Sequence, residues 1–202
     1  MPDEWIYGRE QYWDFVLAHR LAKGNSILYG VASDDAHYYD DESRGRHTCC
    51  GSGWLMVDCQ GELTERNIAS SLKNGNFYPS NGVILNDISF DSGTGTLSVD
   101  VQAEPDVKYR IDFITTKKDF DRRIELKEFP LENPIRWRTR PVIPEGIGEI
   151  VASVEGASAS YAMESDDLYV RALITSNRPG MLKIPQYPRF ESAWTQPYQN
   201  RK

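Results

Sequence analysis

The sequence is poor in cysteine, with only Cys49, Cys50 and Cys59 among 202 residues. Cys49 and Cys50 are adjacent and Cys59 stands apart, so the paired Cys-x-x-Cys spacing of structural zinc sites is missing. Three cysteines also do not make a disulfide framework. We therefore expect free thiols in a reducing compartment, and a cytoplasmic location is favoured.

Long apolar runs and an excess of basic residues are also missing. No segment approaches the roughly 20 apolar residues that a membrane helix needs, and the mean hydropathy is −0.56, so neither a membrane-spanning helix nor a membrane partner is expected. The first five residues lack the basic and apolar regions of a signal peptide, although a segment preceding the chain could carry a targeting signal. With 23 Lys and Arg against 30 Asp and Glu, and a net charge of −7, binding to a nucleic-acid backbone is not expected.

Residues 1–82 have the pattern of an α/β protein. Apolar residues at helical spacing predict helices over residues 9–23 and 64–74, and Thr64 and Gly75 are suitable caps for the second helix. Residues 26–33 and 54–57 are nearly continuous apolar runs, which are typical of strands covered on both faces in a parallel sheet. The order helix, strand, loop, strand, helix therefore favours an α/β fold for this domain.

Residues 83–202 show a different periodicity. Apolar residues alternate in several short segments, which are separated by turn residues such as Asp91-Ser92-Gly93. This pattern predicts an antiparallel β-sandwich. The alternating positions are Leu97, Val99 and Val101; Tyr109, Ile111 and Phe113; and Leu168, Val170, Ala172 and Ile174.

Two proline-containing regions of the second domain are harder to assign. Residues 130–144 hold four prolines, and we expect an ordered loop or linker there. The tail from residue 178 to 202 contains Phe190, Trp194 and Tyr198. We expect this tail to pack in an extended form against the rest of the protein.

An Asp-x-His pair follows the first predicted strand. Asp35 and His37 come directly after the apolar run, and ligand sites in α/β sheets lie at the carboxyl ends of strands. A carboxylate and an imidazole suit zinc, manganese or iron. A bound ion of this kind lowers the pKa of a coordinated water to about 7 and provides hydroxide at neutral pH. However, aspartate after a strand is also an ordinary turn residue, and zinc usually takes three protein ligands.

Other polar residues near this pair have several interpretations. Asp34 could orient the imidazole of His37, and His47 could be a third ligand, a substrate contact or a solvated side chain. Arg44 and Arg46 could receive a phosphate group. The acidic residues Asp40, Asp41 and Glu42 could bind calcium, but the EF-hand spacing is missing and a solvated loop explains them as well. His19, within the first helix, is expected at the surface or facing a partner.

Several motifs occur in an order that resembles the PHP family of metal-dependent phosphoesterases. These motifs extend from about residue 12 to residue 198. They are Tyr12-Trp13-Asp14, then GVASDDAHYY from Gly30, then Gly53-Trp54-Leu55-Met56-Val57, then Asn74-Gly75, then the run from Phe77 to Val83, then Tyr169-Val170-Arg171 and Ala193-Trp194-Thr195-Gln196-Pro197.

The resemblance implies a distorted seven-stranded β/α barrel in which metal ligands lie at many strand ends, the last of them on an Asp-x-His motif. This motif maps to Asp35 and His37, which would bind the metal and act in catalysis. The implied reaction is hydrolysis of a small phosphorylated substrate by metal-bound hydroxide.

The sequence lacks the His-x-His motif with which the family opens, and the barrel strands that should precede Arg9 are missing. The chain is therefore expected to be a C-terminal portion, with the last barrel elements in residues 1–82 and an appended β-rich domain in residues 83–202. We expect little or no activity, and no metal need be bound by the chain alone. A partial barrel leaves open edges, so we expect a homo-oligomer or completion by an N-terminal region.

Two other functions remain open from the sequence. The chain could be a non-catalytic binding or interaction module built on the β-sandwich. It could also be a complete small metallohydrolase whose ligands are Asp35, His37 and His47, which would require these three side chains to converge on one ion.

Overall fold

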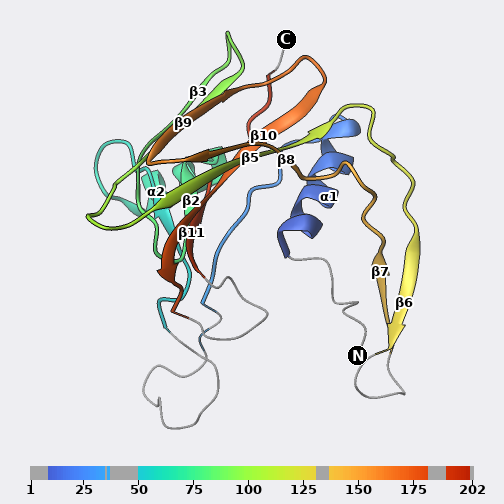
Figure 1. The fold of residues 1–202 in the computed structure, drawn as a ribbon, viewed down its shortest axis with the longest axis horizontal. Helices are drawn as coiled ribbons and strands as arrows, with labels where there is room; N and C mark the ends of the chain where they lie inside the picture. Colours follow the sequence, from blue (N-terminus) through green and yellow to red (C-terminus); the bar gives the residue numbers. More distant parts are fainter. Residues whose placement is uncertain (1–8, 35, 37–49, 131–136, 182–189, 201–202) are drawn as a thin grey trace.

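The computed structural model describes residues 9–34, 36, 50–130, 137–181 and 190–200. Two helices and eleven strands lie within these residues (Figure 1). The helices are α1 (Arg9–Ala22) and α2 (Glu65–Asn74). The strands are β1 (Trp54–Val57), β2 (Phe77–Ser80), β3 (Leu85–Asp91), β4 (Thr96–Val101), β5 (Tyr109–Lys117), β6 (Leu126–Pro130), β7 (Trp137–Pro141), β8 (Glu149–Glu155), β9 (Ser158–Ala162), β10 (Asp167–Pro179) and β11 (Phe190–Trp194).

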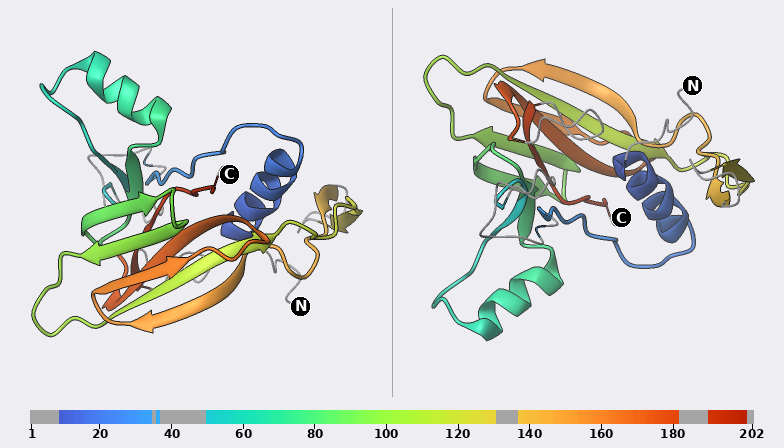
Figure 2. Two further views of the ribbon diagram at one scale, coloured as in Figure 1. Left: turned by 90° about the horizontal axis from the view of Figure 1, so that it is seen from above. Right: turned by 90° about the horizontal axis from the view of Figure 1, so that it is seen from below.

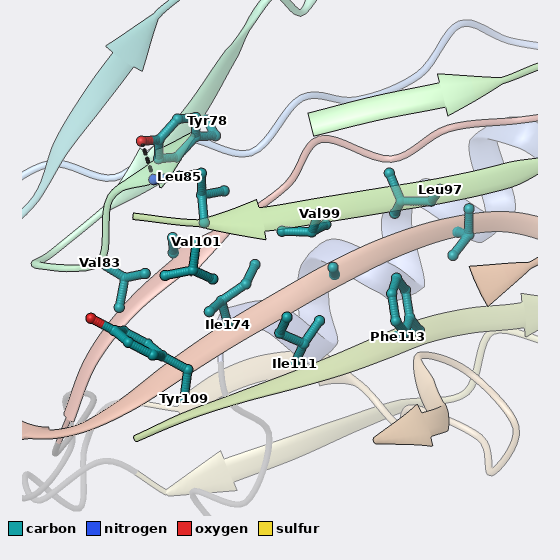
Figure 3. Packing of buried hydrophobic residues seen from close by; sticks show 13 residues of the cluster. Tyr78, Val83, Leu85, Leu97, Val99, Val101, Tyr109, Ile111, Phe113 and Ile174 are labelled. Atoms are coloured by element: carbon teal, nitrogen blue, oxygen red, sulfur yellow. Dashed lines mark hydrogen bonds between the residues drawn. The ribbon is translucent and has the colours of Figure 1, made fainter. Parts of the chain in front are cut away.

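The described strands form three antiparallel sheets. The largest has six strands in the order β1-β2-β11-β10-β5-β8, the second has the order β3-β4-β9, and β6 and β7 form a hairpin of their own. Every pairing among these strands is antiparallel. The first two sheets face each other across one apolar core (Figure 3), which is the arrangement of a β-sandwich.

The alternating residues predicted from the sequence build this core. Leu97 and Val99 of β4 point toward Ile111 and Phe113 of β5, and all four are at most 2% exposed. In a strand, successive side chains point to opposite faces, so every second residue faces the second sheet. The β-rich architecture predicted for this part of the chain is therefore confirmed.

Helix α1 covers the opposite face of the six-stranded sheet. Phe15, Leu17, Ala18 and Leu21 of the helix form a second buried cluster with Tyr169 of β10. Figure 2 shows α1 lying against the sheet, whereas α2 projects away from it. Neither described helix is long and apolar enough to span a membrane.

The predicted ends of both helices agree closely with the structure. The Thr64 side chain accepts a hydrogen bond from the Asn67 N–H and caps α2. Gly75 follows α2 with φ 78°, the left-handed conformation that glycine adopts at low cost. Gly24, with φ 73°, follows α1 in the same way.

The α/β interpretation of residues 1–82 is wrong in two respects. Residues 26–33 are not a strand, and β1 pairs antiparallel with β2 rather than lying in a parallel sheet. A two-sided apolar run forms a parallel strand only when neighbouring strands are available, and the described residues provide none. The described residues thus form mostly antiparallel β-sheet with two helices, and they do not support the partial β/α barrel expected for residues 1–82. Strands β1 and β2 precede Gly82, yet they belong to the same sheet as β10 and β11.

The two proline-containing regions adopt more regular structure than the sequence indicates. Strands β6 and β7 pair from Leu126↔Pro141 to Pro130↔Trp137, so the expected loop at residues 130–144 contains a strand. The described part of the tail, residues 190–200, packs in extended form as expected. Tyr198 forms a bridge with Val170 of β10 and stacks on the Phe90 ring at 5.0 Å between centroids.

Candidate functional site

The segment that connects α1 to the Asp-x-His motif crosses the outer face of the six-stranded sheet. Its described residues contact three elements in turn. The Tyr29 ring packs edge-on against Phe77 of β2, and its hydroxyl donates to the Asn74 carbonyl at the end of α2. Further along, Ser33 lies against Gly53, where a Cβ atom would be 3.2 Å from the Ser33 carbonyl carbon. The segment therefore runs toward the start of β1.

The side chain of Gln196 binds both main-chain groups of Gly30. Its N–H donates to Gln196 Oε1 at 2.8 Å, and its carbonyl accepts from Gln196 Nε2 at 2.9 Å. The primary amide of glutamine thus makes the pair of hydrogen bonds that a neighbouring strand would otherwise make. Gln196 is itself only 2% exposed.

Trp13 of α1 holds the same segment from the other side. Its indole Nε1 donates to the Leu28 carbonyl at 2.8 Å. The ring also packs so closely on Gly30 that a Cβ atom there would lie 2.6 Å from Cη2 of the indole. Gly30 therefore occupies a slot that has no room for a side chain.

A buried ion pair fixes the helix that carries Trp13. Arg171 of β10 donates to both carboxylate oxygens of Asp14, at 2.8 and 2.5 Å. Its guanidinium also lies over the Trp13 ring, 4.9 Å from the centroid, and Glu10 is 3.6 Å from Nη1. Arg171 is 1% exposed. Burial disfavours the charged form, but the Asp14 carboxylate outweighs this effect and raises the pKa of Arg171.

A chain of hydrogen bonds extends this ion pair into the sheet. Tyr169 donates to Asp14 Oδ1 at 2.7 Å, and its hydroxyl lies 3.0 Å from Thr116 Oγ1, which accepts from the Gly148 N–H. Burial, followed by the charge of Asp14, raises the pKa of Tyr169. Tyr169 therefore remains a neutral donor, and the network is an anchor for α1.

Asp34 joins the two described ends of the following loop. Its carboxylate accepts from the Gly51 N–H at 2.8 Å and from the Ala36 N–H at 3.1 Å. The bond from Gly51 has the larger effect, and together the two bonds lower the pKa of Asp34 below its ordinary value of 3.8. Within the described residues, Asp34 therefore binds main-chain amides. The role predicted for it, orienting His37, is not tested by these contacts.

The other residues predicted for the site lie outside the described residues. These are Asp35 and His37, predicted as catalytic residues and metal ligands, and Arg44, Arg46 and His47, predicted to contact substrate or metal. The acidic run Asp40-Asp41-Glu42 lies there too. Their roles stay predictions. His19 lies within the described residues, where its Nδ1 donates to the Phe15 carbonyl and its ring contacts Phe120. His19 therefore contacts Phe15 and Phe120 of the buried cluster beneath α1.

Sequence reasoning did not foresee an acidic cluster at the start of β10. Carboxylates of Glu164, Asp166 and Asp167 lie within 4.8 Å of one another. The Lys117 ammonium contacts all three, at 2.6, 3.0 and 2.9 Å respectively, and these contacts raise the pKa of Lys117. Burial and the hydrogen bond to Asp167 raise the pKa of Tyr161 to about 12. Lys117 therefore offsets part of the negative charge of this cluster.

The contacts of Asp34 lead to a testable expectation. Asp34→Ala should accelerate hydrogen exchange at the Gly51 amide, because the carboxylate that holds this N–H is removed. Asp58→Ala is the matched control, since the Asp58 carboxylate accepts from the Gln60 side chain. In the wild type, folding lowers the pKa of the Asp34 carboxyl. The stabilisation that its hydrogen bonds provide is therefore present above pH 3.8 and is lost as the pH falls through the lowered pKa. NMR-detected exchange that is equal in both variants would contradict this role.

Comparison with known proteins gives no assignment. No protein-family model matches the chain, and neither curated proteins nor solved structures yield a match. Function is therefore inferred from the residues and their geometry alone.

Proposed function

We propose that this chain is a C-terminal portion of a metal-dependent phosphoesterase, in which residues 26–33, which are not a strand in this structure, become one when paired with further barrel strands and lead to the metal ligands Asp35 and His37. The β-sandwich is then the appended domain, and its outer face carries this strand. The observation that supports the proposal is the incomplete pairing of residues 26–32. They have the apolar sequence of a buried strand. However, no hydrogen bond between two main-chain groups joins them to another described segment.

This incomplete pairing has a physical consequence. Main-chain N–H and C=O groups that become buried without partners cost free energy comparable to a lost hydrogen bond. Gln196 satisfies only the groups of Gly30, Trp13 satisfies the carbonyl of Leu28, and Arg20 satisfies the carbonyl of Ser26. A polypeptide that adds strands beside residues 26–32 would satisfy the others. We propose that this polypeptide also provides the remaining metal ligands, because two ligands are fewer than a catalytic site needs.

Asp35 and His37 supply two of the ligands that a borderline divalent ion needs. A carboxylate and an imidazole are ligands that zinc, manganese and iron accept. A divalent ion bound there would lower the pKa of water and so supply a nucleophile toward the phosphorus of a small phosphorylated substrate. Arg44, Arg46 and His47 would contact the phosphate oxygens. Asp34, whose carboxylate accepts two main-chain N–H groups, would hold the base of the loop. We expect little or no turnover by this chain alone.

A second candidate function is a non-catalytic binding module. The antiparallel order of all described strand pairs favours it, because this order is that of a sandwich and not of a β/α barrel. The engagement of Asp34 in loop hydrogen bonds is also consistent with an ordinary turn. Under this candidate, Asp35 and His37 would hold no metal.

A manganese titration distinguishes the two candidates. With only two of its ligands present, the chain alone is expected to bind Mn²⁺ weakly, measured at high Mn²⁺ concentration as the loss of free Mn²⁺ signal in electron paramagnetic resonance, and we expect Asp35→Ala and His37→Ala each to weaken binding at least about tenfold. Manganese is the suitable probe because the thiols of Cys49 and Cys50 prefer zinc. Asp166→Ala, which removes a carboxylate from the Lys117 cluster, is the matched control and should bind like the wild type. Equal stoichiometric binding by all four proteins would exclude Asp35 and His37 as ligands.

A further inference from the structure

We infer that strand β8 pairs with β8 of a second copy of this chain, so that two six-stranded sheets join edge to edge. β8 is the last strand of its sheet, and among the described strands it pairs with β5 alone. In Figure 2 it lies at the margin of the sheet, drawn in light orange. This inference is independent of the proposed function and of any metal.

Strand β8 is the least protected outer strand of the two packed sheets. Proteins prevent edge-to-edge association with charged side chains, prolines, bulges or very short edge strands. β1 has only four residues, and β3 carries the exposed Asp87 and Asp91 together with a register shift. β9, all of whose residues are described, exposes no large apolar side chain. In contrast, β8 exposes Ile150, Val151 and Val154, at 55%, 36% and 36%.

The main-chain groups that β8 turns toward its free edge belong to Ser153 and Glu155. The Gly156 N–H donates to the Tyr109 carbonyl of β5 at 2.9 Å, and the pairing of β8 with β5 is regular from Glu155 to Ala152. In an antiparallel ladder, residues that bond to the neighbouring strand alternate with residues whose N–H and C=O groups point away from it. Counted back from Gly156, Glu155 and Ser153 are the residues that point away.

An antiparallel copy of β8 satisfies these groups when Val154 lies on the twofold axis. Ser153 of each chain is then opposite Glu155 of the other, and the main-chain groups of both residues bond across the edge. Val154 is the cross-strand neighbour of Ile111 and so lies on the core face, where its side chain meets the same side chain of the second copy. Both copies use one surface, so the contact closes as a dimer.

The charges of β8 favour this register over the obvious alternative. If the two copies aligned over their full length, Glu149 of one would lie opposite Glu155 of the other, and like charges directly opposite each other are destabilising. With Val154 on the axis, Glu155 is opposite a serine and Glu149 lies outside the paired run. Arg110, the cross-strand neighbour of Glu155 on β5, adds a positive charge beside it. The register shift of β8 lies on the Glu149 side, outside the paired run as well.

Sedimentation equilibrium of the full chain from about 10 μM to 1 mM, a range that covers weak complexes, tests the inference. We expect a monomer–dimer equilibrium. Glu155→Pro removes an N–H that faces the free edge and none that faces β5, so it should raise the dissociation constant at least about tenfold. Ser160→Pro is the matched control and should dimerise like the wild type. Ser160 faces the free edge of β9, because Ala157, three residues earlier, bonds to Val101 of β4.

Hydrogen exchange locates the contact. In the wild type, exchange at the Ser153 and Glu155 amides should slow as the protein concentration rises, whereas exchange at the Ser158 and Ser160 amides should not change. Val154→Lys, which places two ammonium groups at the axis, should also weaken the dimer and decides the question if Glu155→Pro does not fold. A monomer over the whole range, a dimer without slowed exchange at Ser153 and Glu155, or equal dissociation constants for Val154→Lys and Ser160→Pro would overturn the inference.

Discussion

Replacing Asp14 by alanine is expected to lower the free energy of unfolding by about 3–5 kcal/mol, because the buried, charged Arg171 then loses the carboxylate to which it donates two hydrogen bonds. Both groups are about 1% exposed, and Arg171 donates to both Asp14 oxygens. The loss of the acceptor of the Tyr169 hydroxyl adds to the effect. Urea unfolding followed by tryptophan fluorescence measures the change.

Two comparison proteins make this result specific. Glu104→Ala removes the partner of Arg178 in an exposed pair, and its effect should be far smaller because solvent screens exposed pairs. The double variant Asp14→Leu with Arg171→Met should recover much of the loss, since it replaces both charges with apolar groups. An Asp14→Ala protein as stable as the wild type would show that the ion pair does not anchor α1.

Replacing Phe113 by alanine is expected to destabilise the protein by a similar amount, about 3–5 kcal/mol. The ring is fully buried between the two sheets and stacks on Tyr161 at 5.7 Å between centroids. Removing it leaves a cavity that the close-packed core fills only in part. The free energy of unfolding in urea again provides the measurement.

Phe190→Ala is the matched control for the core variant. Phe190 also lies on a strand of the six-stranded sheet, but it is 45% exposed, so its removal should cost much less than that of Phe113. Equal effects of the two substitutions would contradict a core located between the two sheets.

Local patterns in the sequence are sufficient to predict the β-sandwich. The alternation of Leu97, Val99 and Val101 identifies both the strand β4 and the face that it buries, because the side-chain period of a strand is two. The caps of α2 at Thr64 and Gly75 are equally local signals. In contrast, the strands from Leu126 to Pro141 were missed because prolines normally mark loops, although edge strands and hairpins tolerate them.

Residues 26–33 could not be assigned correctly from the sequence, because whether an apolar run forms a strand depends on its neighbours. Among its described partners are the side chains of Trp13 and Gln196, which lie 15 and 166 residues away from the main-chain groups that they bind. In the sequence, Gln196 stands out only as part of the motif Ala193-Trp194-Thr195-Gln196-Pro197. The signal that could have revealed the slot is Gly30, a residue without a side chain in an otherwise bulky apolar run.

The candidate site was predicted at a place that the structure only partly describes. Asp34 is found at the base of the loop, with its carboxylate bound by the Gly51 and Ala36 amides, whereas the roles of Asp35 and His37 stay predictions. The acidic residues Glu164, Asp166 and Asp167 are close together in the sequence, but their pairing with Lys117 of β5 is not predicted by it. Long-range pairing of this kind has no signal in the local sequence.

Diffraction from crystals soaked in Mn²⁺, recorded at the manganese absorption edge, tests the central claim most directly. The proposal predicts an anomalous peak at coordinating distance from the Asp35 carboxylate and the His37 imidazole, and its loss in crystals of His37→Ala. A peak only at Glu164, Asp166 and Asp167, or side chains of Asp35 and His37 that diverge with no ion between them, would contradict the claim.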